Sequence, residues 1–202
     1  LEDACAAAEL GADALGFVFY RGSRRAISAE GAAAIIAALP PFVTPVGVFA
    51  DAPFPEILRT AEQAGICCLQ LHGTIELPEA VPPALQLVRA FRTSPHFDPA
   101  AALSCRAMAV LVDGYSERAP GGTGTVADWK TAATIARSRR LILSGGLCAA
   151  NVGEAIRTVR PWAVDVSSGV ETSPGLKDRV LMERFIGAVR SVPEDAGSNL
   201  VP

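Results

Sequence analysis

The chain has 202 residues, of which 50% are hydrophobic and 19% charged, and its formal net charge is −3. This balance is typical of a globular protein and unlike that of a disordered chain. The slight acidic excess argues against a basic nucleic-acid-binding surface. The longest uninterrupted apolar run, Ala32–Leu39, is too short to cross a membrane. We therefore expect neither nucleic acid nor a membrane as a partner.

The five cysteines indicate a reducing compartment. They are odd in number and form neither a C-x-x-C motif nor a Cys/His pair, which argues against a disulfide framework and against a zinc site. The two histidines, His72 and His96, are too few for a typical metal cluster. The sequence thus predicts a cytoplasmic protein with no metal.

Short apolar runs recur along the chain at spacings that suit one strand and one helix each. Continuous runs of this kind are typical of strands that are buried on both faces of a parallel sheet. Seven such strands are predicted, at Ala14–Phe19, Val43–Phe49, Cys67–Leu71, Leu87–Phe91, Ala107–Val112, Arg140–Leu143 and Ala163–Val166.

Segments with helical spacing lie between these runs. Ser28 is a helix start signal, and Gly11 and Gly65 are stop signals. Helices are predicted at Leu1–Leu10, Glu30–Leu39, Pro55–Ala64, Ala127–Ala136, Asn151–Val159 and Asp178–Val189.

The alternation of strands and helices predicts an α/β fold, a (β/α)8 TIM barrel. A complete barrel begins with a strand, whereas this chain begins with a helical segment. We therefore expect that strand 1 is absent from the sequence and precedes Leu1, so that the chain runs from helix 1 to helix 8. Residues 1–190 are predicted to form a single domain, followed by a polar tail at 191–202. An open doubly wound sheet is the second architecture that the pattern allows.

In such barrels the loops that follow the strands build the active site. Asp113 directly follows the apolar run that begins at Ala107, so the strand delivers a carboxyl group to that end of the barrel. A carboxyl group there can have a raised pKa and donate a proton. The other interpretation is an Asp that caps the turn before Gly114.

Two glycine-bearing turns follow the last two predicted strands, Ser144-Gly145-Gly146 and Ser167-Ser168-Gly169. Glycine lets backbone N–H groups approach an anion closely, and TIM barrels often bind phosphate on these two loops. Either turn alone could simply end a strand, but as a pair in these positions they predict a phosphate site.

Three arginines, Arg21, Arg24 and Arg25, follow the first predicted strand. Guanidinium groups recognise carboxylate or phosphate, although a solvated basic loop is the competing interpretation. The sequence leaves the roles of Asp51, His72, Arg92 and Asp165 open.

These features favour an enzyme that acts on a small phosphorylated anion by acid–base chemistry. The sequence contains neither a P-loop nor a dinucleotide-binding fingerprint in the right context. No cofactor is therefore expected.

Several segments with their spacing resemble phosphoribosylanthranilate isomerase of tryptophan biosynthesis, over essentially the whole chain up to about residue 190. The last three segments of the list that follows, taken together with their spacing, are specific to this family. The segments are Gly11–Phe19, Ser23–Ser28, Val46–Phe49, Leu69–Gly73, Gly121–Gly124, Leu143–Leu147 and Val164–Glu171.

The resemblance implies the Amadori rearrangement of N-(5-phosphoribosyl)anthranilate to 1-(2-carboxyphenylamino)-1-deoxyribulose 5-phosphate. It implies that Asp113 is the general acid and that Arg25 holds the anthranilate carboxylate. Backbone groups of the two glycine-bearing turns would bind the phosphate, and a further substrate loop is possible. The implied phosphate residues are Gly145, Gly146, Ser167, Ser168 and Gly169, and the possible substrate loop is Gly122, Thr123 and Gly124, with His72.

This sequence differs from the family at the general base. In the family, the general base is a Cys on the first strand, in a Lys-Ile-Cys-Gly-like motif. This sequence has no such motif, and Cys5 lies in the helical segment that would follow that strand. We expect the base to lie upstream of Leu1.

Two alternatives stay open. One is another cofactor-free sugar-phosphate barrel enzyme, such as an indole-glycerol-phosphate synthase. That enzyme would be expected to have a catalytic Lys on an early strand, whereas Lys130 and Lys177 both lie late. The other is a catalytically inactive barrel that binds a phosphorylated ligand. The oligomeric state is also open, with a monomer favoured, as is a second substrate from the histidine pathway.

Overall fold

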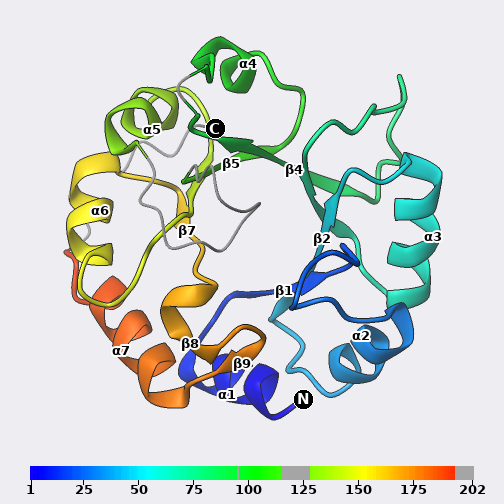
Figure 1. Cartoon of the computed structure of the whole chain (residues 1–202), viewed down its shortest axis with the longest axis horizontal. Helices are drawn as coiled ribbons and strands as arrows, with labels where there is room; N and C mark the ends of the chain where they lie inside the picture. Colours follow the sequence, from blue (N-terminus) through cyan, green and yellow to red (C-terminus); the bar gives the residue numbers. More distant parts are fainter. Residues whose placement is uncertain (95, 115–127, 194–202) are drawn as a thin grey trace. The chain divides into compact units, whose positions relative to one another are not determined.

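The computed structural model describes residues 1–94, 96–114 and 128–193 (Figure 1). The chain forms two compact units, Leu1–Val88 and Arg89–Pro202. The strands β1 to β7 follow one another in the sheet in chain order. The strand β4, Gln86–Arg92, begins in the first unit and ends in the second.

The first unit alternates helices and strands. Its parallel strands β1, β2 and β3 pair in register, with Gly16 opposite Val46 and Gly47 opposite Leu69. The helices α2 and α3 pack side by side, outside these strands (Figure 1). The elements are α1 (Glu2–Leu10), β1 (Ala14–Val18), α2 (Ala29–Ile36), β2 (Thr44–Ala50), α3 (Phe54–Ala64) and β3 (Cys68–His72).

Local signals in the sequence set the helix ends of this unit. The Ser28 hydroxyl oxygen accepts a hydrogen bond from Gly31 N at 3.1 Å and so caps the start of α2. Gly11 and Gly65 end α1 and α3 with φ angles of 97° and 73°, in the left-handed region that favours glycine. Apolar side chains then bury the helices against the strands, with Ile57 of α3 and Leu69 of β3 fully buried.

The second unit continues the alternation and adds a short antiparallel hairpin, β8–β9. Within this unit, each of the helices α4 to α7 packs against the next helix in the chain (Figure 1). Its elements are α4 (Pro99–Leu103), β5 (Ala109–Asp113), α5 (Trp129–Ala136), β6 (Leu141–Leu143), α6 (Val152–Val159), β7 (Ala163–Val164), the 3-10 turn η1 (Ser168–Val170), β8 (Glu171–Ser173), β9 (Leu176–Lys177) and α7 (Arg179–Arg190).

The core of the second unit forms around β5. All five residues of β5 are buried, which is typical of an inner parallel strand covered on both faces. It pairs with β6 through Leu111 and Ile142, and β6 pairs with β7 through Leu143 and Val164. The guanidinium group of Arg139 stabilises the segment before β5, because it donates hydrogen bonds to four carbonyl groups. These acceptors are Ala102 O (3.2 Å), Leu103 O (3.0 Å), Cys105 O (2.6 Å) and Ala107 O (2.6 Å).

The seven predicted strands are confirmed, with their ends moved by up to two residues, and the six predicted helices are confirmed as α1, α2, α3, α5, α6 and α7. The sequence did not predict α4, which has five residues and begins at Pro99. Nor did it predict β8–β9, because Glu171–Ser173 is polar and carries no apolar run. The prediction of one domain over 1–190 with a tail at 191–202 stays a prediction. In the part of the chain that the structure describes, no helix is both long enough and apolar enough to span a membrane.

Candidate active site

Asp113 is the last residue of β5 and is buried, with 9% of its surface exposed. Its carbonyl oxygen accepts hydrogen bonds from Thr93 N at 3.0 Å and from Thr93 Oγ1 at 3.2 Å. Burial, assisted by the nearby Asp165, raises the pKa of Asp113 from 3.8 to about 6. The backbone N–H of Gly114 and the charge of Arg92 oppose this rise only in part. The side chain therefore exchanges a proton close to neutral pH, as a general acid requires.

Asp165 directly follows β7 and is partly buried. Burial raises its pKa above the usual range, against the hydrogen bond from Ser144 and the charge of Lys177. Ser144 Oγ lies 3.3 Å from Asp165 Oδ2. The structure thus brings a second carboxyl group near Asp113, a residue whose role the sequence left open.

The loop after β6 packs directly against Asp113. Gly145 has a φ angle of 88°, and a Cβ atom there would overlap with the backbone N of Gly114 and lie 2.9 Å from Asp113 Oδ1. Gly146 also has a positive φ angle, of 64°. Only glycine allows this close approach without strain.

Asn151 fixes the shape of this loop. Its Oδ1 accepts a hydrogen bond from Cys148 N at 2.8 Å, and its Nδ2 donates one to Gly146 O at 2.9 Å. The sequence did not single out Asn151, because its partners are backbone groups that only the folded loop brings within reach.

The second glycine-bearing turn follows β7 and opens η1. Gly169 lies against the loop after β6, since a Cβ atom there would overlap with the carbonyl oxygen of Leu147. The structure therefore brings Asp113, Gly145, Asp165 and the turn Ser167–Gly169 together at the carboxyl ends of β5, β6 and β7. Successive backbone hydrogen bonds, Ser144 N to Val112 O and Asp165 N to Leu143 O, both 2.8 Å, align these ends.

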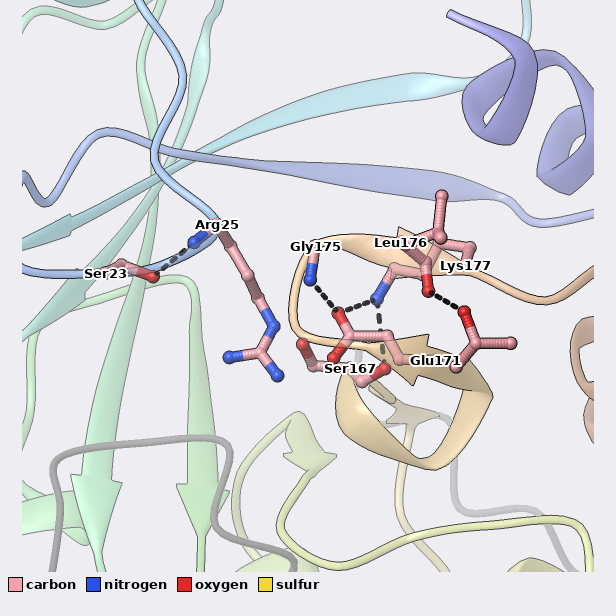
Figure 2. Close-up of polar contacts among 8 residues, drawn as sticks. Ser23, Arg25, Ser167, Glu171, Gly175, Leu176 and Lys177 are labelled. Atoms are coloured by element: carbon pink, nitrogen blue, oxygen red, sulfur yellow. Dashed lines mark hydrogen bonds and ion pairs between the residues drawn. The ribbon is translucent and has the colours of Figure 1, made fainter.

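The hairpin β8–β9 continues from this turn. Figure 2 shows the Lys177 ammonium group between the Glu171 carboxylate and the carbonyl oxygen of Ser167, with Nζ 2.9 Å from each acceptor. Sequence reasoning missed this contact, although Glu171 ends a motif that resembles the isomerase family.

Arg25 lies in the first unit, on the loop after β1. The backbone N–H of Arg25 donates a hydrogen bond to Ser23 Oγ at 3.1 Å (Figure 2). The next residue, Ala26, forms a bridge with Val18 at the carboxyl end of β1. Arg25 is partly buried, whereas Arg21 and Arg24 are exposed. The local fold thus distinguishes Arg25 from the other two arginines of the loop.

His72 is the last residue of β3, and its Nε2 lies 3.0 Å from Gln70 Nε2. Beside it, Asp51 Oδ1 accepts a hydrogen bond from Thr74 N at 3.1 Å, and a Cβ atom at Gly73 would overlap with this carboxylate. Asp51 therefore supports the turn after β3. The predicted substrate-loop residues Gly122, Thr123 and Gly124 lie outside the described residues.

Comparison with known proteins shows the family of the chain. The family model of N-(5'phosphoribosyl)anthranilate (PRA) isomerase matches residues 1–188. The N-(5'-phosphoribosyl)anthranilate isomerase of Geobacter sp. (strain M21) is 46% identical over 197 residues, which cover 95% of this chain and 94% of that protein. The enzyme of the same name from Pseudomonas fluorescens (strain Pf0-1) is 46% identical over 192 residues, or 94% of each chain.

Solved structures agree. The phosphoribosyl anthranilate isomerase of Thermus thermophilus superposes with a TM-score of 0.85 at 40% identity, over 95% of this chain and 94% of that one. A phosphoribosyl anthranilate isomerase in complex with reduced 1-(o-carboxyphenylamino)-1-deoxyribulose 5-phosphate has a TM-score of 0.78 at 39% identity, over 94% and 93% of the two chains. These likenesses confirm the predicted TIM-barrel class and the resemblance noted in the sequence. The chain belongs to the N-(5'-phosphoribosyl)anthranilate isomerase family.

Proposed function

We propose that this protein catalyses the Amadori rearrangement of N-(5-phosphoribosyl)anthranilate to 1-(2-carboxyphenylamino)-1-deoxyribulose 5-phosphate, a step of tryptophan biosynthesis. The observation that carries the proposal is Asp113, a buried carboxyl group at the end of β5 with a pKa of about 6. Asp113 lies against Gly145, and Gly145 belongs to one of the two turns proposed to bind phosphate. The family of the chain and the bound phosphorylated compound in a related isomerase support the same reaction.

In this proposal Asp113 is the general acid. It gives its proton to the furanose ring oxygen while the bond from that oxygen to C1 breaks, and the lone pair of the anthranilate nitrogen forms a C=N bond. A base then removes the proton from C2, and the electrons move to give the enolamine, which tautomerises to the aminoketose. In the family that the sequence resembles, this base is a Cys.

A pKa of about 6 suits this role, since about a tenth of the Asp113 side chains then carry a proton at pH 7. A carboxyl group with the ordinary pKa of 3.8 would be protonated in only about one molecule per thousand. Burial thus supplies the acid that the ring-opening step needs, without a cofactor.

Arg25 is proposed to bind the anthranilate carboxylate through its guanidinium group, a geometry in which two parallel hydrogen bonds can form. The turns that contain Gly145 and Gly146, and Ser167, Ser168 and Gly169, are proposed to bind the 5-phosphate through backbone N–H groups. We propose that the protein acts on this free small molecule in the cytoplasm as a monomer.

Turnover of N-(5-phosphoribosyl)anthranilate by the purified protein tests this function. The loss of substrate fluorescence should be accompanied by formation of the aminoketose, identified by mass spectrometry and by its reaction as a ketose. Binding of the reduced product analogue without any turnover would instead support the inactive ligand-binding barrel. Absence of both binding and turnover would favour another sugar-phosphate enzyme.

A further inference from the structure

Lys177 and Glu171 form an ion pair next to the turn Ser167–Gly169. The reaction described above gives neither residue a role. They lie opposite each other in the hairpin β8–β9. Lys177 Nζ is 2.9 Å from Glu171 Oε1 and 2.9 Å from the carbonyl oxygen of Ser167 (Figure 2). Only 3% of the Glu171 side chain and 27% of the Lys177 side chain are exposed. Since charges this shielded from water need their hydrogen bonds, we expect the ammonium group to keep a defined position.

The backbone around Lys177 is fixed from both sides. The hairpin turn contains Gly175, which has a φ angle of 91° and donates its N–H to Glu171 Oε1 at 3.3 Å. Directly after Lys177, Asp178 N donates a hydrogen bond to Val170 O at 2.9 Å, and the Asp178 carboxylate caps α7 by accepting from Leu181 N at 3.0 Å. The Lys177 side chain therefore extends from a rigid base.

The carbonyl group that Lys177 holds belongs to the same peptide unit as the N–H of Ser168. A peptide unit is planar and trans, so its carbonyl and its N–H point in opposite directions. A bond from the ammonium group to Ser167 O therefore fixes the direction of the Ser168 N–H. The positive charge on the carbonyl side also polarises this N–H and makes it a stronger donor.

We propose that Lys177 is a positioning residue for phosphate binding. By donating a hydrogen bond to the Ser167 carbonyl oxygen, it directs the Ser168 N–H toward the substrate phosphate. This inference rests on the proposed function, in which the turn Ser167–Gly169 binds that phosphate. Glu171 contributes to this positioning, because its carboxylate keeps the Lys177 ammonium group from turning away to water.

Binding of two analogues separates this role from a general structural one. The affinities of the parent protein and of Lys177→Met are measured by calorimetry for reduced 1-(o-carboxyphenylamino)-1-deoxyribulose 5-phosphate and for the same compound without its phosphate. Lys177→Met should bind the phosphorylated compound about tenfold or more weakly, since a charge-assisted hydrogen bond is lost. Its affinity for the compound without phosphate should change by less than about twofold.

Two further variants complete the test. Lys130→Met removes the other lysine of the chain, which is exposed on α5, and should leave both affinities unchanged. Lys177→Arg keeps a charged donor and should recover most of the lost affinity. If Lys177→Met does not fold, Glu171→Gln provides the comparison, with a smaller loss that is again confined to the phosphorylated compound.

The outcomes also separate this inference from the function on which it rests. Equal affinity of the parent for the two compounds would contradict phosphate binding by the turn, and with it the proposed binding mode. A parent that prefers the phosphorylated compound, with the same preference in Lys177→Met, would overturn the positioning role alone. An equal loss for both compounds in Lys177→Met would also overturn it, because a general disturbance of the fold has no preference for phosphate.

Discussion

The buried Asp113 carboxyl group costs the folded protein stability once it ionises. Its pKa lies above that of an ordinary Asp, at about 6 compared with 3.8, so the folded state binds the proton more tightly than the unfolded state. Stability therefore falls as the pH rises from about 3.8 to about 6, and the cost reaches about 3 kcal/mol above that range. A site that needs a proton donor near neutral pH thus has a folding penalty built into it.

Asp113→Asn removes this ionisation and should stabilise the protein at pH 7.5 by up to about 3 kcal/mol. At pH 4.5 most of the parent Asp113 is protonated when folded, and the gain should shrink to about 1 kcal/mol. Urea unfolding of parent and variant at the two pH values measures both differences. An equal effect of the substitution at both would mean that the pKa of Asp113 is not raised.

Among the structural elements, the loop after β6 depends most on a single residue type. Gly145→Ala places a methyl group against Gly114 and Asp113 and also puts a side chain at a φ angle of 88°. The left-handed conformation alone costs about 1–2 kcal/mol for a residue with a Cβ atom, and the overlap adds to this. We expect a loss of more than about 2 kcal/mol in stability and a large loss of turnover.

Gly187→Ala is the matched control for this substitution. Gly187 lies inside α7, where a Cβ atom has no heavy atom within 4 Å. Alanine should stabilise the helix there by up to about 1 kcal/mol. Thermal unfolding of the two variants should therefore shift the melting temperature in opposite directions. A Gly145→Ala protein as stable and active as the parent would contradict the close packing at Asp113.

The elements also show what the sequence could and could not predict. The strands were predictable because stretches such as Val110–Val112 are apolar on both faces, and the position of Asp113 followed directly from the end of its strand. The contact of Lys177 with Ser167 O was not predictable, because a lone lysine in a polar segment has the pattern of a solvated charge. Its acceptor is a backbone carbonyl ten residues away, which only the pairing of β8 with β9 brings within reach.

At the scale of the whole molecule, the single domain predicted for 1–190 can be tested through its cooperativity. Both tryptophans, Trp129 and Trp162, lie in the unit Arg89–Pro202. Tryptophan fluorescence therefore follows this unit, while far-UV circular dichroism follows the helices of both. Because β4 begins in one unit and ends in the other, we expect the unfolding midpoints from the two methods to coincide. Two separated midpoints would show that the units unfold independently.

The proposed mechanism depends on the proton that Asp113 donates, and the most direct measurement is the pH dependence of kcat/KM for N-(5-phosphoribosyl)anthranilate in the parent and in Asp113→Asn. We predict that kcat/KM of the parent decreases as the pH rises through about 6, because the acid must be protonated. Asp113→Asn should lose this dependence and turn over about 10²-fold to 10⁴-fold more slowly, while binding the reduced product analogue about as tightly as the parent. A variant as active as the parent, with the same pH profile, would contradict the central role of Asp113.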